Sequence, residues 1–419
     1  MTRDQGAAER FGREVLGPVV AEFSFRLWSL ASLLEDRDDA ALLFCARGGL
    51  RLQLAYERFL AAAGLPAPVR AVPFMVSRVA AIRPALVRLA RERLDALPPA
   101  AAAALTYEFG NAALPDVVQF VSGVRPPPGG GWDGPFDAAR LRTYLTAPDG
   151  AEAVAALAEQ ADLFARHLAD CLAGRRRAVV VDTGLYGTTR EVLADGYPDL
   201  AISSALMFRS FRGQNPSPGT FGLSVAAPEY SPFRRRTAIL RHWHFIEWLF
   251  EPDLESVRTF TWDQGVPRSN LEVDGWQQRV LPEPGSPFAG VLGYLDGLPR
   301  SPVPQVLADA DAAWSRLHRA LVWPDAEAGR ALQVGSRSHD FGRAETWTQR
   351  ADPGPIAALR GSTMWREGEI GRSGSPLRLP VLATVEAAYS ARHLVRTFRR
   401  TADARLRRGP ATATTEGDR

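Results

Sequence analysis

The sequence contains no lysine, so all 50 residues counted as Lys or Arg are arginine. This absence excludes the lysine of a Walker A loop, the Schiff-base lysine that holds pyridoxal phosphate, and the lysine of a protein-kinase site. Any phosphate that this protein binds must therefore contact arginine, backbone N–H groups or a metal ion.

Cysteine and long apolar runs are also scarce. The 419 residues include two cysteines, Cys45 and Cys171, which argues against a disulfide framework and is too few for a structural zinc site of cysteines. No stretch approaches the roughly 18 apolar residues of a membrane span, and residues 1–6 lack the apolar core of a signal peptide. A net charge of +3 over this length does not suggest a nucleic-acid partner. We therefore expect a cytoplasmic protein that binds no nucleic acid.

Short apolar runs alternate with amphipathic helical patterns along the first half of the chain. Strands are predicted at 41–46, 69–76, 178–181 and 201–208. Strands separated by helices form parallel sheets, so the sequence predicts an α/β fold with a parallel sheet flanked by helices. Further predictions are helices at 15–34, 50–63 and 78–94, a helical insertion at about 95–175 containing a Pro- and Gly-rich loop at 124–131, and an α/β domain over 1–230.

The character of the sequence changes after about residue 230, where aromatic residues become dense. This composition predicts an aromatic-rich α+β region, which is a candidate platform for an acceptor because flat apolar rings pack on sugar faces. An ordinary hydrophobic core explains the same composition. The predicted parts are the region 231–408, strands at 257–262 and 276–280, helices at 304–322 and 377–403, and a disordered tail at 409–419.

The segment 178–193 is the most informative part of the chain. A buried strand ends at Asp182, a turn rich in glycine and hydroxyl groups follows, and then a helical pattern begins. Such a turn aims backbone N–H groups and the positive end of the helix dipole at one point, which suits a phosphate. Asp182, at the carboxyl end of the strand, suits ribose hydroxyls or a magnesium ion.

Other protein classes also use a motif like Asp182-Thr183-Gly184. Aspartic proteases need two such carboxylates, and the triplet occurs once here. Haloacid-dehalogenase phosphatases need a second acid where Gly184 stands. Sugar-kinase and actin-like ATPases place the turn inside a hairpin, whereas a helix is predicted to follow here, and a nucleotide-sugar or methyltransferase Rossmann turn has a different glycine spacing.

A second strand–turn–helix unit occupies 43–50, with Arg47, Gly48 and Gly49 in its turn. Ligands of open α/β sheets collect at the carboxyl ends of the strands, so the two turns together indicate a site for two anions. A plain tight connection between strand and helix explains either turn by itself. Further candidates to face a phosphate are Ser77, Arg78 and Arg83, for which arginines on a solvated helix face are the alternative.

Two clusters in the second half of the chain carry chemistry of other kinds. His242 and His244 would share a face on a strand and, with Glu247, resemble a metal site, although packing among tryptophans is the alternative. Glu247 is also a candidate base. Near the C-terminus a basic amphipathic helix suits either an anionic membrane surface or solvent; its residues are Leu394, Arg396, Phe398, Arg399, Arg400, Arg405, Leu406, Arg407 and Arg408.

Three stretches in order resemble a known family: 17–28 leading to 43–49, then 73–78, then 181–189. The family comprises phosphoribosyltransferase-type glycosyltransferases of bacterial polysaccharide gene clusters, often fused to a haloacid-dehalogenase phosphatase domain that is absent here. The resemblance implies a phosphoribosyltransferase-like sheet with a helical insertion. It also implies transfer of ribose 5-phosphate from phosphoribosyl pyrophosphate (PRPP), with Mg²⁺, to a sugar or other hydroxyl acceptor, after which a separate phosphatase acts.

The resemblance assigns roles to individual residues. Arg47, Gly48 and Gly49 fall on the pyrophosphate loop, and Asp182 falls on the ribose-binding acid and candidate magnesium ligand. Val181 stands where ordinary members carry another acid, so a catalytically silent phosphoribosyl-binding protein is one alternative, and a nucleobase-like or natural-product acceptor is another. The 5-phosphate loop corresponds to Thr183, Gly184, Leu185, Tyr186, Gly187, Thr188 and Thr189.

Overall fold

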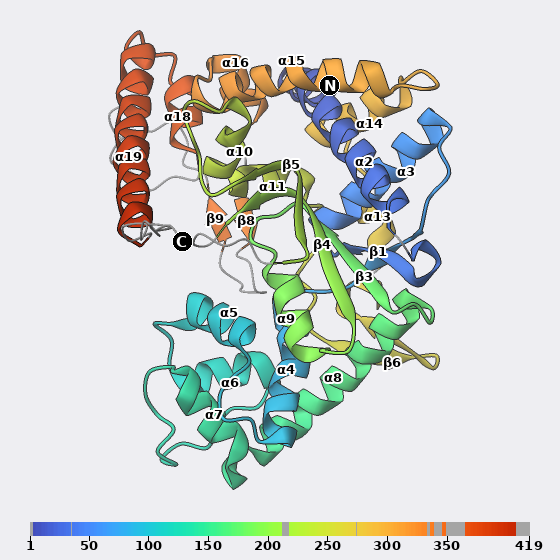
Figure 1. Cartoon of the computed structure of the whole chain (residues 1–419), viewed down its shortest axis with the longest axis vertical. Helices are drawn as coiled ribbons and strands as arrows, with labels where there is room; N and C mark the ends of the chain where they lie inside the picture. Colours follow the sequence, from blue (N-terminus) through green and yellow to red (C-terminus); the bar gives the residue numbers. More distant parts are fainter. Residues whose placement is uncertain are drawn as a thin grey trace, which may run out of the picture.

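A five-stranded parallel sheet forms the centre of the molecule (Figure 1). The computed structural model describes residues 3–34, 36–211, 218–273, 275–332, 336–338, 346–348 and 365–407. The strands lie in the order β2-β1-β3-β4-β5, and all neighbours are parallel, which confirms the predicted α/β fold. Their bounds are β1 Ala40–Cys45, β2 Arg70–Phe74, β3 Arg177–Asp182, β4 Ala201–Ser210 and β5 Thr220–Ala227.

Both faces of the sheet are covered, which explains why its central strands are continuous apolar runs rather than alternating ones. In β1 all six residues are buried. Leu42 and Phe44 belong to one hydrophobic core, and Leu43 and Cys45 to the other. Alternate side chains along the strand therefore pack against two separate layers of helices, one on each face of the sheet.

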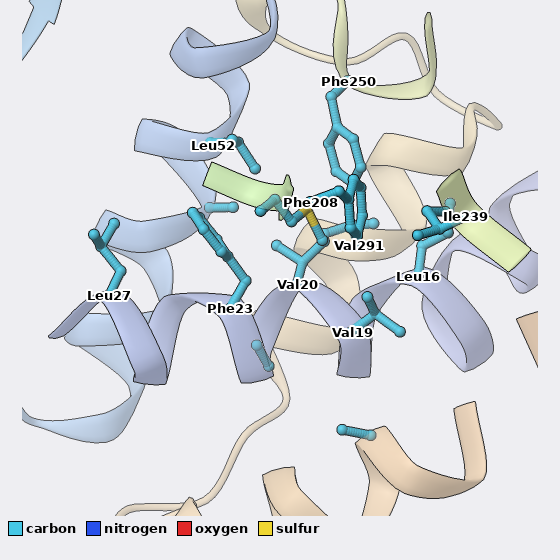
Figure 2. Packing of buried hydrophobic residues seen from close by; sticks show 14 of the residues in the cluster. Leu16, Val19, Val20, Phe23, Leu27, Leu52, Phe208, Ile239, Phe250 and Val291 are labelled. Carbon is cyan, nitrogen blue, oxygen red and sulfur yellow. The ribbon is translucent and has the colours of Figure 1, made fainter. Parts of the chain in front are cut away.

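The first layer joins helices from both ends of the chain. Figure 2 shows Val20 and Phe23 close to Phe208, Phe250 and Val291, which all belong to one core. The N-terminal and C-terminal parts of the sequence thus bury apolar surface against each other. The helices of this layer are α2 Gly17–Ser32, α3 Gly48–Ala63, α14 Pro287–Asp296 and α15 Val303–Val322.

The second layer lies on the opposite face and extends into a group of helices at the lower end of the molecule in Figure 1. Four of these helices follow one another between α4 and β3 in the stretch predicted as a helical insertion. The helices are α4 Arg78–Glu92, α5 Pro99–Phe109, α6 Leu114–Ser122, α7 Ala138–Thr146, α8 Ala151–Leu172 and α9 Thr188–Gly196.

The remaining elements are short, except for the C-terminal helix at the left edge of Figure 1. They are α1 Arg3–Phe11, η1 Gly12–Leu16, η2 Arg37–Asp39, η3 Pro148–Gly150, η4 Arg235–Thr237, α10 Ala238–Arg241, α11 Trp243–Phe250, β6 Phe260–Asp263, β7 Val266–Ser269, α12 Asn270–Val273, α13 Trp276–Val280, α16 Ala326–Ala331, β8 Ser336–Ser338, β9 Thr346–Thr348, α18 Arg366–Arg372 and α19 Arg378–Arg407. Among the described residues, no helix has the length and apolar character needed to cross a bilayer.

Three predictions about local structure need correction or comment. The strand predicted at 276–280 is wrong, because this segment is helix α13, in which Trp276 and Val280 are four residues apart and share one face. The strand predicted at 257–262 is shifted to β6, which pairs antiparallel with β7. Strand β5 was not predicted, since Gly222 interrupts its apolar pattern. The tail at 409–419 lies outside the described residues.

Candidate functional site

The two predicted turns meet at one edge of the sheet. Strands β1 and β3 are neighbours, with Phe44 paired to Val181, so the segments that follow the two strands leave the sheet side by side. A Cβ atom added to Gly48 would lie 3.2 Å from the Cγ2 atom of Thr183, and one added to Gly49 would lie 3.0 Å from the carbonyl oxygen of Val181. The glycines therefore let the two turns approach each other closely. The order of strands reverses between β1 and β3, which is where ligands of open α/β sheets bind.

Arg47 has an unusual backbone conformation at the start of α3. Its φ is 69° and its ψ is −108°, a region that non-glycine residues rarely occupy. The residue is 8% exposed. Its Nη2 donates to Oε1 of Glu251 at 2.5 Å and its Nη1 donates to the Ser256 hydroxyl at 3.2 Å. The segment 251–256 thus holds a buried cation over the carboxyl end of β1.

Asp182 lies half-buried at the end of β3. Its Oδ1 accepts a hydrogen bond of 2.8 Å from the backbone N–H of Thr183. Burial, and then the nearby Asp182 carboxylate, raise the pKa of the Cys45 thiol well above its usual range. The carboxylate of Asp182 therefore lies close enough to Cys45, the last residue of β1, to influence the ionisation of its thiol.

The turn after Asp182 is fastened to strand β4. The backbone N–H groups of Phe208 and Ser210 donate to the carbonyl oxygens of Thr183 and Leu185, each at 2.9 Å. Gly184 has a φ of +151°, and a Cβ there would lie 2.4 Å from the Phe208 carbonyl oxygen, so no other residue fits without a shift.

The turn ends at the start of α9. Gly187 is the N-cap residue of this helix, with a φ of +76° that favours glycine. Thr188 and Thr189 follow it in the first turn and are half-exposed. The amides at the start of a helix carry partial positive charge, so this end of α9 is suited to an anion.

Polar groups that sequence reasoning missed gather beside Gly187. The hydroxyls of Ser204 and Thr220 are buried and find no hydrogen-bond partner among the described residues. A Cβ on Gly187 would lie 3.2 Å from the Thr220 hydroxyl and 3.6 Å from that of Ser204. Arg209 donates to the Thr220 carbonyl.

Arg190 adds a second guanidinium beside Arg209. Its Nε donates to the carbonyl oxygen of Ile202 at 3.0 Å. The pKa of Arg209 is lowered by burial and also by Arg190, whereas Glu191 acts in the opposite direction. Arg190 thus lies in the first turn of α9, and Arg209 on β4 is near enough for the two positive charges to interact. In the sequence, the signal that could have identified these arginines was their position, directly after Thr189 for Arg190 and near the end of a predicted strand for Arg209.

The candidates after β2 have structural contacts. The Ser77 hydroxyl accepts from the backbone N–H of Ala80 at 3.2 Å, as an N-cap residue does, and donates to the Val257 carbonyl at 2.6 Å. Arg78 begins α4 and is half-buried.

The side chain of Arg83 is buried among backbone carbonyls. It donates to the carbonyl oxygens of Val121 at 2.8 Å and Arg258 at 2.5 Å. Burial lowers the pKa of Arg83 to about 10. These contacts hold the segment around Arg258 over the end of β2.

The predicted arrangement of the two histidines is wrong, because neither lies on a strand. His242 is the C-cap residue of α10, whereas His244 lies within α11. Burial, and then the positive charge of Arg241, hold the pKa of His242 well below its usual range. Within the described ranges, no group of three or more His, Cys, Asp or Glu side chains is placed to hold a metal ion.

Glu247 lies on α11, one helical turn before Glu251. Glu251, which the sequence did not single out, contributes a carboxylate that contacts Arg47. Its sequence signal was weak, since it is one acid after an apolar helix. The two carboxylates are four residues apart, so they leave the end of α11 on the same side.

The donor set of the site suits a magnesium ion that arrives with phosphates. Asp182 supplies one carboxylate at the edge of the sheet. Mg²⁺ commonly binds through one or two carboxylates together with phosphates of the substrate and does not require a cage of protein ligands. Asp182 is therefore a residue that could contribute a carboxylate to such an ion.

Because the sequence comparisons with known proteins found no match, any functional conclusion rests on the geometry of the site. No protein-family model matches the chain, and no curated protein matches it. The fold and the site define an α/β protein with an arginine-bearing turn and an aspartate-bearing turn side by side at the carboxyl edge of a parallel sheet.

Proposed function

We propose that this protein has a phosphoribosyltransferase-like fold and transfers ribose 5-phosphate from PRPP to a sugar or other hydroxyl acceptor, releasing pyrophosphate. The observation that carries the proposal is the adjacency of the Arg47 turn and the Asp182 turn where the strand order reverses between β1 and β3. A ligand with an anionic group at each end and a ribose between them suits such a pair of turns.

The chemistry requires stabilisation of charge more than covalent help. As the bond to pyrophosphate breaks, the anomeric carbon gains positive charge and the leaving group gains negative charge. A Mg²⁺ ion held by Asp182 would neutralise part of that negative charge. The Arg47 guanidinium would neutralise the rest, and fixed donors of this kind contribute about 3–4 kcal/mol each to the transition state.

The 5-phosphate would anchor the ribose at the start of α9. Backbone amides of the Gly187 turn, with the guanidiniums of Arg190 and Arg209, offer charge and donors for a phosphate. Binding energy from this unreactive end positions the reacting carbon. The Asp182 carboxylate, between the two anion sites, suits the ribose hydroxyls.

A base must accept the proton of the acceptor hydroxyl. Glu247 is our candidate, since it lies on α11 one turn from the residue that contacts Arg47. General-base catalysis contributes on the order of 10²–10⁴-fold. The acceptor would then approach from the side of the aromatic-rich segment around α11, and a separate phosphatase would remove the 5-phosphate afterwards.

One observation favours a second candidate, a phosphoribosyl-binding protein without catalysis. Val181, at the position of the second acid of ordinary phosphoribosyltransferases, is fully buried in the core. Asp182 is therefore the acid that β3 offers at this edge. A protein that retains both anion sites but lacks the second carboxylate, at the position of Val181, would bind PRPP without releasing pyrophosphate.

Calorimetry with PRPP and Mg²⁺ tests the proposal. We expect the wild type to bind, Asp182→Ala to lose most of the affinity, and Asp199→Asn, an exposed acid in the turn after α9, to bind as the wild type does. Absence of binding by the wild type would refute both candidates. Binding without pyrophosphate release across a panel of glycan, nucleobase and small-molecule acceptors would favour the silent binding protein.

A further inference from the structure

One face of the C-terminal helix α19 packs against the rest of the protein. Leu382 is 1% exposed. Glu386 accepts hydrogen bonds from Tyr230 and Arg241, and the Nε2 of His393 lies 3.3 Å from the Ser231 hydroxyl. These residues of α19 recur at intervals of four and seven along the helix, so they define a single docked face.

The opposite face of α19 presents apolar side chains to solvent. Leu394 is 44% exposed, Val395 51% and Phe398 74%. At 100° per residue, Phe398 points about 140° away from His393, and Leu394 and Val395 lie on either side of it. Three large apolar side chains therefore form an outward face near the end of the helix.

A loop contacts α19 on its docked side, at His393. Phe233 is 70% exposed, and its ring centroid lies 6.1 Å from that of His393. Arg234 follows it and is also exposed. We define the α19 surface by the outward apolar side chains Leu394, Val395 and Phe398 together with the exposed Arg392 and Arg399.

The charge around this surface selects its partner. Residues 390–399, the last part of α19 whose side chains are described, contain three arginines and no acid, and one of the three, Arg396, pairs with Glu229. Arg392 and Arg399 are exposed at the border of the apolar face. A second copy of the helix would bring like charges together, which is unfavourable. Apolar side chains bordered by arginine instead match an anionic lipid surface, where rings enter the boundary of the acyl chains and arginines contact headgroup phosphates.

We propose that the α19 surface docks the protein on a membrane that contains anionic lipids. The contact is peripheral, because none of the helices in the described ranges is suited to span a bilayer. Isolated exposed leucines are ordinary in proteins, but clustered apolar side chains bordered by cations are not. This inference does not depend on the proposed transferase activity.

Co-sedimentation of the full chain with vesicles tests the inference. We expect binding to phosphatidylcholine vesicles that contain phosphatidylglycerol and little binding to phosphatidylcholine alone. Arg392→Glu with Arg399→Glu should weaken binding by about 25-fold or more, since each cation near the surface is worth about fivefold. Leu394→Ser with Phe398→Ser should weaken it by at least about tenfold.

Matched variants elsewhere on the surface control for general effects. Leu33→Ser, at a leucine that is 82% exposed, and Arg300→Glu should bind as the wild type does. Thermal unfolding followed by circular dichroism should show that all variants fold, because the altered side chains are exposed.

Three results would overturn the inference. Equal binding to neutral and anionic vesicles would remove the role of charge. Loss of binding in the arginine variants alone would indicate recognition of polyanions such as nucleic acid rather than lipid. A doubled mass in light scattering that the Leu394→Ser, Phe398→Ser variant abolishes would assign the surface to a second copy of this chain.

Discussion

The guanidinium of Arg47 lies 2.5 Å from the carboxylate of Glu251, although 204 residues separate them in the sequence. Arg47 follows β1 and Glu251 follows α11, so the contact joins the sheet edge to the aromatic-rich region. Both side chains are largely buried, at 10% and 14% exposure. The ion pair holds Arg47 in a backbone conformation that costs about 1–3 kcal/mol.

In the proposed reaction, Glu251 competes with pyrophosphate for the Arg47 guanidinium. Glu251→Gln removes the competing negative charge, so we expect inorganic pyrophosphate with Mg²⁺ to bind about tenfold more tightly. Isothermal calorimetry measures the change. Glu255→Gln, at an exposed acid four residues on, is the matched control and should leave the affinity unchanged. Weaker binding by Glu251→Gln would show instead that Glu251 positions Arg47 for the ligand.

Substitutions at two glycines with positive φ distinguish the cost of backbone strain from the cost of a steric clash. Gly174 has a φ of +84° and no atom within 4 Å of an added Cβ, so Gly174→Ala should cost about 1–2 kcal/mol of unfolding free energy. Gly184→Ala adds a clash of 2.4 Å with the Phe208 carbonyl and should cost more. Urea denaturation measures both losses. PRPP binding should fail in Gly184→Ala alone, and equal losses of stability in the two variants would contradict the structure of this turn.

Arg190 and Arg209 are the guanidiniums that we propose bind the 5-phosphate at the start of α9. Removing either guanidinium from a bound phosphate costs about 1.5–3 kcal/mol, so Arg190→Met and Arg209→Met should weaken ribose 5-phosphate binding by about 10–150-fold. Arg91→Met, at an exposed arginine at the end of α4, should not. Competition against PRPP, or direct calorimetry, measures the affinities. Wild-type affinity in both variants would remove these arginines from the site.

Glu22 makes stability depend on pH. Burial alone would raise its pKa, but hydrogen bonds from Arg236, Trp314 and Arg26 outweigh burial and leave the pKa below its usual value. A folded-state pKa below the unfolded one stabilises the protein at neutral pH, and this stabilisation is lost as pH falls through the folded-state value. We therefore expect stability to decrease on the acid side of about pH 4.

Glu22→Gln should flatten that acid dependence. The amide cannot replace the carboxylate for three donors, so we also expect a loss of about 1–3 kcal/mol at pH 7. Urea unfolding followed by tryptophan fluorescence at pH 7 and at about pH 3 measures both effects, with the exposed Glu14→Gln as the control. An unchanged difference between the two pH values in Glu22→Gln would assign the acid sensitivity to other groups.

Local features of the fold could be predicted because their causes are local. Strands β1 and β3 are buried on both faces, so they appear in the sequence as unbroken apolar runs. The turns after them contain glycines at positions where a side chain would meet the neighbouring turn or strand. Helix α13 was predicted wrongly, since five residues with two apolar positions fit either a strand or one turn of helix.

The sequence by itself determined the two turns, the absence of lysine at any phosphate site and the alternation that produces a parallel sheet. Only the tertiary structure decided that β1 and β3 are neighbours, that Glu251 contacts Arg47, and that Phe233 lies beside α19. Hydrophobic periodicity and glycine act over a few residues and are readable in order along the chain. Strand order and contacts between distant segments depend on which buried surfaces pack together, and that choice is made by the whole core at once.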